Sequence, residues 1–136
     1  MLIKEYTKFD MNEILSLYES VGWTNYTSKP TMLENAFKKS LLILGAYDND
    51  KLVGIVRVVG DEASVVYIQD MLVMPSYQRR GIGTSLMREL MERYKNTYQM
   101  TLLTDDIEKN KAFYQSLGFV NITDIHAVGF FRSNDL

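Results

Sequence analysis

The residues best suited to chemistry lie in the basic, glycine-rich segment Gln78-Arg79-Arg80-Gly81-Ile82-Gly83. Apolar residues follow at helical spacing, so the segment is predicted to open a helix whose buried face is Leu86, Met87, Leu90, Met91 and Tyr94. The first amides of a helix have no partner within it, and they lie at the positive end of its dipole. With two arginines beside these amides, the segment predicts a site for a phosphate-bearing ligand.

The segment before this loop, residues 65–74, is rich in apolar and β-branched residues and is predicted to be a strand. Pro75 ends the strand because proline has no N–H to donate. The glycine spacing differs from both the dinucleotide fingerprint and the Walker loop. Alternatively, Gly81 and Gly83 only allow the helix to pack closely on the strand. The strand, Pro75, Gln78 and both arginines stand in the order that a ligand-binding loop needs, which favours ligand binding.

Composition excludes several classes of protein. The net charge of −2 leaves no basic surplus along the chain, so we expect no nucleic-acid partner. The chain has no cysteine and one histidine, His126, which argues against a metal centre, a cysteine nucleophile and a Ser-His-Asp triad. We therefore expect no metal site, and we interpret His126 as a surface residue.

Length and hydropathy predict a single domain over residues 1–136. The N-terminus lacks the basic lead-in and long apolar run of a signal peptide. The longest uncharged apolar run, residues 41–47, is too short to cross a bilayer. We expect a soluble cytoplasmic protein that does not associate with membranes.

Hydrophobic periodicity and turn residues divide the chain into strands and helices that position the loop. Helices are predicted at residues 10–21, 31–37, 84–94 and 110–117. Strands are predicted at residues 2–6, 41–47, 51–59, 65–74, 98–104, 119–123 and 127–131. Residues 23–30 are expected to be a polar loop that carries two aromatic side chains. The resulting order is β-α-α-β-β-β-α-β-α-β-β.

The glycine loop resembles the Gln/Arg-x-x-Gly-x-Gly/Ala motif of the GCN5-related N-acetyltransferases, the GNAT superfamily. The preceding Asp70-Met71-Leu72-Val73-Met74-Pro75 is similar to the strand end of that family, and Phe113-Tyr114-Gln115-Ser116-Leu117-Gly118-Phe119 resembles its Phe/Leu-Tyr-x-x-x-Gly-Phe helix. The element order also matches, so the resemblance covers nearly the whole chain. It implies an α/β GNAT fold with a mixed, mostly antiparallel central sheet of six to seven strands, flanked by about four helices.

The resemblance implies an acetyl-CoA-dependent N-acetyltransferase in which a primary amine attacks the thioester directly within a ternary complex. The lack of cysteine agrees with direct transfer. The resemblance assigns the pantetheine arm to backbone groups of Met71 and Val73, with an oxyanion donor near Met71. It assigns the pyrophosphate to the loop residues Gln78, Arg79, Arg80, Gly81, Gly83 and Thr84.

Two catalytic residues follow from the resemblance. Tyr114 matches the tyrosine beside the coenzyme sulfur and is interpreted as the general acid for the leaving thiolate. The family often places an asparagine seven residues before this tyrosine, where this chain has Ile107. Asp70 is the only carboxylate in the fourth strand, and alternation points it away from Gln69 unless a bulge intervenes. A structural role and a water-relayed catalytic role both remain open for Asp70.

The acceptor is expected to bind at the first two helices, where aromatic rings can hold a cation. Trp23, Tyr26 and Gln69 are the predicted contacts, and Tyr18 is either a wall of the site or core. By analogy we expect a small-molecule amine. Two other functions remain open: a non-catalytic acyl-CoA sensor, and a nucleotide- or RNA-binding domain. The family also implies a homodimer, with residues 128–131 as either interface or core.

Overall fold

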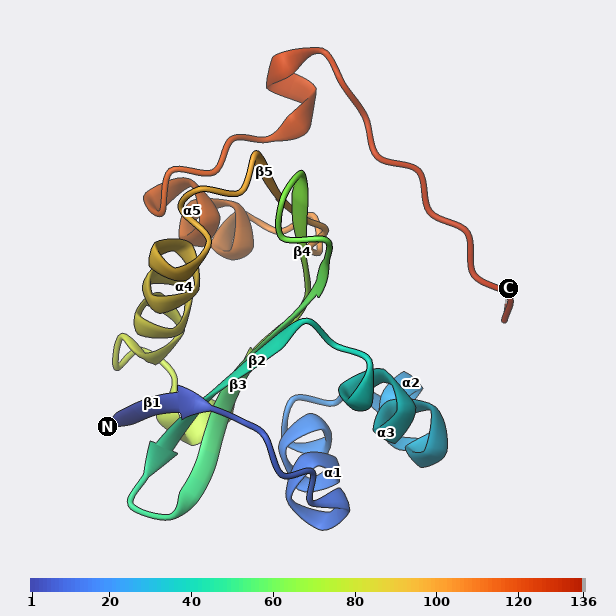
Figure 1. Ribbon diagram of the computed structural model, residues 1–136, viewed down its shortest axis with the longest axis vertical. Coiled ribbons are helices and arrows are strands. Elements are labelled where there is room, and N and C mark those ends of the chain that lie inside the picture. The colour runs from blue at the N-terminus through green and yellow to red at the C-terminus, as the bar shows by residue number, and fades with distance from the viewer. Residues whose placement is uncertain (136) are drawn as a thin grey trace. The chain divides into compact units, whose positions relative to one another are not determined.

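The computed structural model describes residues 1–135, which divide into two compact units at residue 102. The first unit contains, in order, β1 (Leu2–Glu5), α1 (Met11–Ser20), α2 (Thr24–Thr27), α3 (Pro30–Lys38), β2 (Leu42–Asp48), β3 (Lys51–Gly60), β4 (Val65–Val73), the 3₁₀ turn η1 (Pro75–Tyr77), α4 (Ile82–Arg93) and β5 (Gln99–Leu102) (Figure 1). The second unit contains α5 (Glu108–Ser116) and the 3₁₀ turn η2 (Ile122–Ile125).

The first unit is built on a five-stranded sheet of order β1-β2-β3-β4-β5. The first four strands pair antiparallel with their neighbours, whereas β5 pairs parallel to β4. A parallel pair needs a crossover, which α4 supplies between β4 and β5. Helix α4 lies on one side of the sheet and α1, α2 and α3 lie on the other (Figure 1). The β4–α4 connection therefore passes from the sheet directly to one of its covering helices.

Both faces of the sheet are buried, as the apolar strands predict. On the α1 side the core is formed by Tyr6, Ile14, Leu17, Tyr18, Leu33, Phe37, Ile43, Leu52, Ile55 and Leu72. On the other side α4 contacts β2, β3 and β4, and its buried residues are Ile82, Leu86, Met87 and Leu90. Burial of each such side chain contributes about 1.5–3 kcal/mol to the free energy of unfolding. Apolar packing on both faces of the sheet therefore fixes the position of β4.

The structure corrects the predicted number of elements. The described residues contain five strands rather than six to seven, and five α-helices rather than about four. The additional helix is α2, a single turn within the expected loop 23–30. Its backbone groups form hydrogen bonds within the turn. For example, the Ser28 amide donates to the Thr24 carbonyl at 3.0 Å. One turn of helix is too short to leave a periodic signal in the sequence.

The predicted strands at 119–123 and 127–131 are wrong, since neither segment is a strand in the structure. The Asn121 side chain accepts from the amide of Thr123 at 3.1 Å and from its hydroxyl at 2.9 Å. Such local bonds compete with a sheet ladder. His126 then adopts a left-handed conformation with φ of 63°. The pattern of apolar residues indicates strand propensity, but a strand forms only where a neighbouring strand accepts its backbone hydrogen bonds.

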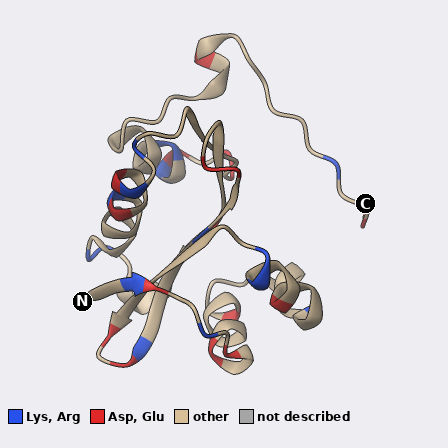
Figure 2. Ribbon diagram, in the orientation of Figure 1, with Lys and Arg blue, Asp and Glu red and all other residues tan. Residues whose placement is uncertain are grey.

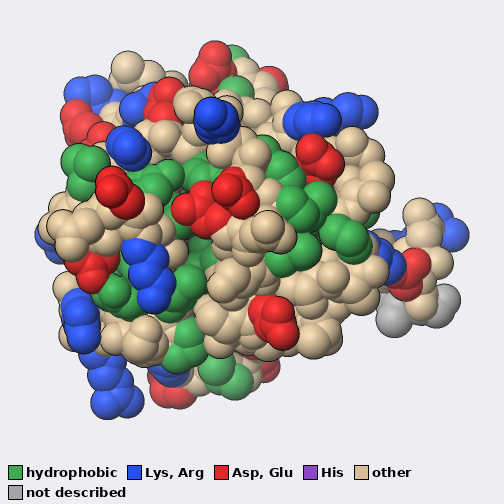
Figure 3. Space-filling view, turned by 90° about the horizontal axis from the view of Figure 1, so that it is seen from below, with side chains coloured by type: hydrophobic (Ala, Val, Ile, Leu, Met, Phe, Trp, Pro, Cys, Tyr) green, Lys and Arg blue, Asp and Glu red, His purple; other side chains and the backbone are tan. Residues whose placement is uncertain are grey.

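Acidic and basic side chains are interspersed with hydrophobic ones on the face drawn in Figure 3. Within residues 1–135, no helix has both the length and the apolar character that crossing a lipid bilayer requires.

Candidate active site

The C-terminal half of β4 extends past the neighbouring strand β5. Pairing of β4 with β5 runs from Val65 to Ile68 only, whereas β4 continues to Val73. The Met74 amide donates to the Val53 carbonyl on β3 at 2.8 Å. Since backbone groups of alternate residues face opposite neighbours, Met71 and Val73 direct their N–H and C=O groups away from β3. We call this side of residues 69–73 the β4 outer edge. It can pair with an extended ligand as with another strand.

The loop after β4 is anchored to that edge. The Gln78 side-chain amide donates to the Val73 carbonyl at 3.1 Å, so Gln78 fixes the loop against the strand. Arg79 and Gly81 both adopt left-handed conformations, with φ of 63° and 77°. This conformation is free of strain for glycine but uncommon for arginine. The two positive φ values turn the chain sharply from η1 into α4.

The N-terminus of α4 is open for an anion. Its N-cap is Gly81, no side chain of the described residues caps it, and its first turn holds no acidic residue. The amide of Ser85 donates to the Gly81 carbonyl at 3.0 Å, so the preceding first-turn amides are the orphan donors of this helix. The half-buried Gly83 and Thr84 supply two of them. The helix dipole adds a positive potential at the same place.

Cations surround the same loop. Arg79 and Arg80 are exposed, and the blue segment before α4 in Figure 2 marks them. The Arg80 guanidinium lies 5.1 Å from the centre of the Tyr77 ring, and the Lys51 ammonium lies 5.6 Å from it. The Tyr77 hydroxyl donates to Asp48 at 2.6 Å, and this hydrogen bond is the main cause of its raised pKa. Tyr77 therefore contacts two cations, of which Arg80 directly precedes the N-cap Gly81.

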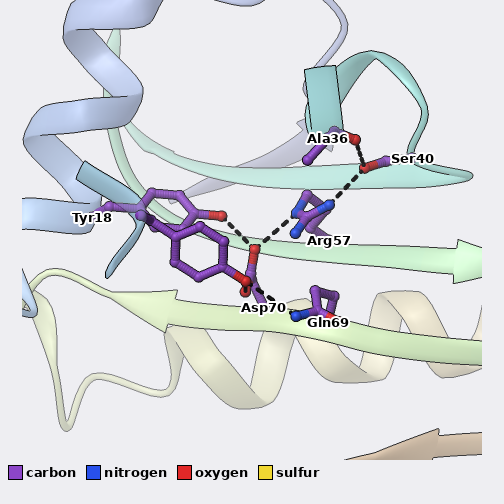
Figure 4. Close-up of polar contacts among 7 residues, drawn as sticks. Tyr18, Ala36, Ser40, Arg57, Gln69 and Asp70 are labelled. Atoms are coloured by element: carbon purple, nitrogen blue, oxygen red, sulfur yellow. Dashed lines mark hydrogen bonds and ion pairs between the residues drawn. The ribbon is translucent and has the colours of Figure 1, made fainter. Parts of the chain in front are cut away.

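Asp70 lies at the centre of a buried polar network on the other side of β4 from α4 (Figure 4). Its Oδ2 accepts from Arg57 Nε at 2.8 Å and from the Tyr18 hydroxyl at 2.7 Å. Its Oδ1 accepts from the Tyr26 hydroxyl at 2.8 Å. The Arg57 guanidinium also donates to the Ser40 hydroxyl at 3.2 Å. Asp70 is 2% exposed and Arg57 is 4% exposed, so this is a buried ion pair with its hydrogen-bonding groups engaged.

A bulge in β4 turns Asp70 toward this network. Arg57 pairs with Asp70 whereas the adjacent Val58 pairs with Ile68, so Gln69 has no opposite residue on β3. The extra residue interrupts strict alternation, and both Gln69 and Asp70 contact the hydroxyl of Tyr26, at 3.1 and 2.8 Å. The sequence rule that places Gln69 and Asp70 on opposite faces therefore does not hold at this point.

Burial and charge together shift the pKa values of the groups around Asp70. Burial raises the pKa of Tyr18 well above its ordinary value, and the negative charge of Asp70 raises it further. The same two causes raise the pKa of Tyr26. For Arg57 burial, the largest single cause, lowers the pKa, but the charge and hydrogen bond of Asp70 together with Tyr18 and Tyr26 outweigh burial, and the net shift of the pKa is upward. Both phenols therefore keep their hydrogens, and Arg57 keeps its charge, at neutral pH.

The structure brings the predicted acceptor residues together. The rings of Trp23 and Tyr26 lie 6.2 Å apart, tilted by 35°, and both side chains are half-buried. Gln69 is exposed and reaches the Tyr26 hydroxyl from β4. Tyr18 is 0% exposed and packs edge-on against both rings, so its role as core, rather than as a wall of the site, is the one observed.

Arg57 was not among the predicted site residues, although the sequence holds a signal for it. It is the only charge within the apolar run Leu52-Val53-Gly54-Ile55-Val56-Arg57-Val58-Val59. A charge inside a strand that is buried on both faces requires a partner of opposite sign. Of the two strands that flank β3, β2 carries a carboxylate only at its end, Asp48, whereas β4 carries Asp70 in its interior, so Asp70 is the partner that charge pairing indicates.

Tyr114 lies on α5 in the second unit. Its ring packs edge-on against Phe113 and Phe119, with centroids 5.0 and 5.9 Å away. Burial raises its pKa, so the phenol holds its hydrogen at neutral pH and is able to donate it. Ile107, at the position where the resembling family often has asparagine, precedes the helix as its N-cap. The nearby Asn110 amide donates to the Thr104 hydroxyl at 3.0 Å.

Comparisons with known proteins bear on the family and the fold. Residues 9–119 match the model of the acetyltransferase (GNAT) family. An "Uncharacterized N-acetyltransferase ycf52" of Gracilaria tenuistipitata var. liui is 28% identical over 85% of this chain, and the chain spans 64% of its length. A solved GNAT-family acetyltransferase from Streptococcus pneumoniae TIGR4 is 44% identical, with a TM-score of 0.88 over 98% of this chain and 97% of its own.

A more distant neighbour shares the fold alone. An aminoglycoside 6'-N-acetyltransferase, solved in complex with coenzyme A, is 19% identical, with a TM-score of 0.67 over 79% of this chain and 64% of its own. The family match covers most of the chain, and the solved structure from Streptococcus pneumoniae covers nearly all of it. The chain therefore belongs to the GNAT family of acetyltransferases.

Proposed function

We propose that the protein transfers an acetyl group from acetyl-CoA to the primary amine of a small molecule, by direct attack of the amine on the thioester. The observation that carries this proposal is that the β4 outer edge is followed in the chain, after the loop of residues 74–81, by the open N-terminus of α4. We call these groups together the coenzyme path. The edge offers main-chain pairing for an amide-bearing arm, and the helix end offers amides and cations for a diphosphate. Few ligands other than a coenzyme A thioester combine these two parts.

Each part of the path has a defined role. Met71 and Val73 would pair with the pantetheine arm, and Gly81, Gly83 and Thr84 would direct backbone amides at the diphosphate. Arg79 and Arg80 would supply positive charge, and Gln78 would hold the loop on the strand through its 3.1 Å bond to Val73. The structural neighbour that was solved with coenzyme A shares this fold, which supports the proposed ligand.

The proposal accounts for the charge and the protons that the reaction moves. When bound, acetyl-CoA supplies an acyl group already activated as a thioester. The Met71 N–H would donate to the thioester oxygen as negative charge develops on it. As the C–N bond forms and the C–S bond breaks, Tyr114 would donate its phenolic hydrogen to the departing sulfur, and the proton lost by the amine nitrogen would return through solvent water to the Tyr114 oxygen. For Asp70 we propose the structural role, because its oxygens already accept three buried hydrogen bonds.

Binding of acetyl-CoA tests the proposal most directly. Ligand at about a hundred times its dissociation constant adds ~2.7 kcal/mol to the free energy of unfolding. For a domain of this size we expect the midpoint of thermal unfolding to rise by roughly ten degrees. NADH and ATP, measured at the same concentrations, are the controls. No shift with millimolar acetyl-CoA, or an equal shift with ATP, would contradict the proposal.

A non-catalytic acyl-CoA sensor is the second candidate. The engagement of Asp70 with Arg57 and two tyrosines favours it, because the only carboxylate of β4 is then not available as a base. A sensor would bind acetyl-CoA as tightly as an enzyme would. It would acetylate no amine in a library screen, and this outcome distinguishes the two functions.

We also propose that two copies associate through residues 128–131. Val128 is 63% exposed, Phe130 is 93% exposed and Phe131 is 74% exposed, which is unusual for adjacent large apolar side chains. A second copy would cover them.

We expect the wild type to elute as a dimer. We expect Phe130→Ser/Phe131→Ser to weaken association at least 100-fold, since each buried phenylalanine contributes about 1.5–3 kcal/mol to the free energy of association. Light scattering during size exclusion measures this. A monomeric wild type at micromolar concentration would rule out the dimer.

A further inference from the structure

We propose that the buried ion pair between Arg57 and Asp70 sets the register of the β4 outer edge, which makes both of them positioning residues for the coenzyme. The inference deepens the proposed function and rests on it, since it names what aims the backbone groups of Met71 and Val73 at the ligand. It is carried by the position of the ion pair, which joins β3 to β4 directly after the bulge at Gln69 (Figure 4).

A hydrogen bond between the two strands shows which of their backbone groups face each other. The Met74 amide donates to the Val53 carbonyl at 2.8 Å. In an antiparallel pair, every second residue directs its backbone groups at the same neighbour. Ile55 therefore also faces β4, and its partner Leu72 faces β3. Met71, which precedes Leu72, faces the outer edge.

The bulge decides that Met71 faces outward. Before the bulge, Val58 pairs with Ile68. If this register continued, Ile55 would pair with Met71 in place of Leu72. The N–H and C=O of Met71 would then bond to β3 and would be lost to the coenzyme. A shift of one residue therefore removes the oxyanion donor of the proposed reaction.

The apolar side chains of β4 do not choose between these two registers. Residues 71–74 are all apolar, and an apolar layer covers each face of the sheet. A shift of one residue exchanges the faces on which the side chains lie, but it still buries apolar residues on both. Hydrophobic burial therefore specifies the register only weakly in this part of β4.

Asp70 is the residue that distinguishes the two registers. In the bulged register its Oδ2 accepts from Arg57 Nε at 2.8 Å, on the side of the sheet that α1 covers. In the other register its side chain would lie on the α4 side, where the buried residues of the helix are all apolar. A carboxylate buried there would have no partner, which is strongly disfavoured. The cost of that alternative holds the bulge in place.

Stability alone does not account for the ion pair. Apolar replacement of a buried pair is often neutral or stabilising, because it avoids the desolvation of two charges. In some proteins, buried polar groups are retained because they specify one register. Arg57 and Asp70 fit that role, since they join the two strands whose register is in question.

Amide hydrogen exchange of the full chain without ligand, followed by NMR, tests the register. In the wild type the Leu72 amide faces β3 and the Met71 amide does not, so we expect Leu72 to exchange at least about 100-fold more slowly. In Tyr18→Phe/Arg57→Met/Asp70→Leu, which removes the buried charges and the buried Tyr18 hydroxyl together, we expect this ratio of rates to fall at least about 10-fold. An unchanged ratio in the folded triple variant would overturn the inference.

Asp70→Asn provides the same test with a smaller change. It keeps the shape of the side chain and removes the charge that disfavours the other register. We expect the ratio of exchange rates to fall at least about 3-fold. An unchanged ratio in Asp70→Asn would overturn the inference even if the triple variant did not fold.

Calorimetric titration with acetyl-CoA tests the consequence for the ligand. We expect the triple variant to bind acetyl-CoA at least about 10-fold more weakly than the wild type, although it is stable, because Met71 and Val73 no longer face the arm. Arg57→Lys keeps a charge that can donate to Asp70, and should bind within about 3-fold of the wild type. Wild-type affinity in the triple variant would overturn the inference.

Glu5→Leu/Arg93→Met is the matched control for this titration. It removes another arginine–carboxylate pair, which is largely exposed and lies at the last residue of α4, far along the helix from the open N-terminus. Since this pair touches neither the bulge nor the coenzyme path, its removal should leave both the exchange ratio and the affinity for acetyl-CoA unchanged.

The two measurements separate this inference from the proposed function. The exchange ratio needs no ligand, so it reports on the register alone. A wild type that binds acetyl-CoA, with an affinity that the triple variant retains, would refute the positioning role and leave the transferase intact. A wild type that does not bind acetyl-CoA, with an exchange ratio that falls in the triple variant, would support the role of the ion pair in setting the register and refute the transferase.

Discussion

Replacing Asp70 with alanine is expected to lower the free energy of unfolding by about 3–5 kcal/mol, because the substitution leaves the Arg57 charge buried without its partner. Arg57 is 4% exposed, and the Tyr18 and Tyr26 hydroxyls would also lose their acceptor. A domain of this kind is stable by about 5–15 kcal/mol in total, so the loss is large. Urea denaturation measures it, and we expect the thermal midpoint to fall by roughly 10–20 °C.

Two controls define the cause of this loss. The exposed pair Lys38–Glu34, at 3.7 Å, gives a matched substitution, Glu34→Ala, which should change stability by less than about 0.5 kcal/mol. The triple variant Tyr18→Phe/Arg57→Met/Asp70→Leu removes the buried charges and the buried hydroxyl together. Since apolar replacement of a buried ion pair is often neutral, we expect it to recover most of the stability. A loss below about 1 kcal/mol in Asp70→Ala would contradict the buried-pair interpretation.

Replacing Tyr114 with phenylalanine is expected to reduce kcat by about 10²–10⁴-fold, the usual contribution of a positioned general acid. The substitution removes one oxygen and retains the ring that packs against Phe113 and Phe119. Binding of acetyl-CoA should therefore persist while release of the thiolate slows. The effect on kcat is measured as the rate of free-thiol release with an amine that is active in a library screen. The acetyl-CoA-induced shift of the thermal midpoint measures binding.

Tyr98→Phe is the control for this substitution, because Tyr98 is 81% exposed and the same oxygen is removed. Its turnover should match that of the wild type. A Tyr114→Phe variant that turns over normally would exclude Tyr114 as the proton donor. If the wild type binds acetyl-CoA and turns over no amine, the sensor function is the correct one.

The sequence by itself predicted the elements whose signals are local. The β-branched run of β4, the proline that ends it, and the glycines before α4 each act on their own backbone or on the next turn. The structure confirms the strand, the turn and the helix, with β4 at Val65–Val73 against the predicted 65–74, η1 beginning at Pro75, and α4 at Ile82–Arg93 against the predicted 84–94. The resemblance to the GNAT family, based on the same segments, is confirmed by the family match. Such features need no distant partner, which is why the sequence is sufficient for them.

Only the tertiary structure decided how Asp70 is used. Its partners Tyr18, Tyr26 and Arg57 are 52, 44 and 13 residues away in the chain, and the bulge at Gln69 brings them within hydrogen-bonding distance. The C-terminal segments failed as predicted strands for a related reason. Their apolar residues carry strand propensity, but pairing depends on a neighbouring strand that propensity does not describe. Hydrogen bonds between distant segments are a property of register and packing, and these are set by the whole fold.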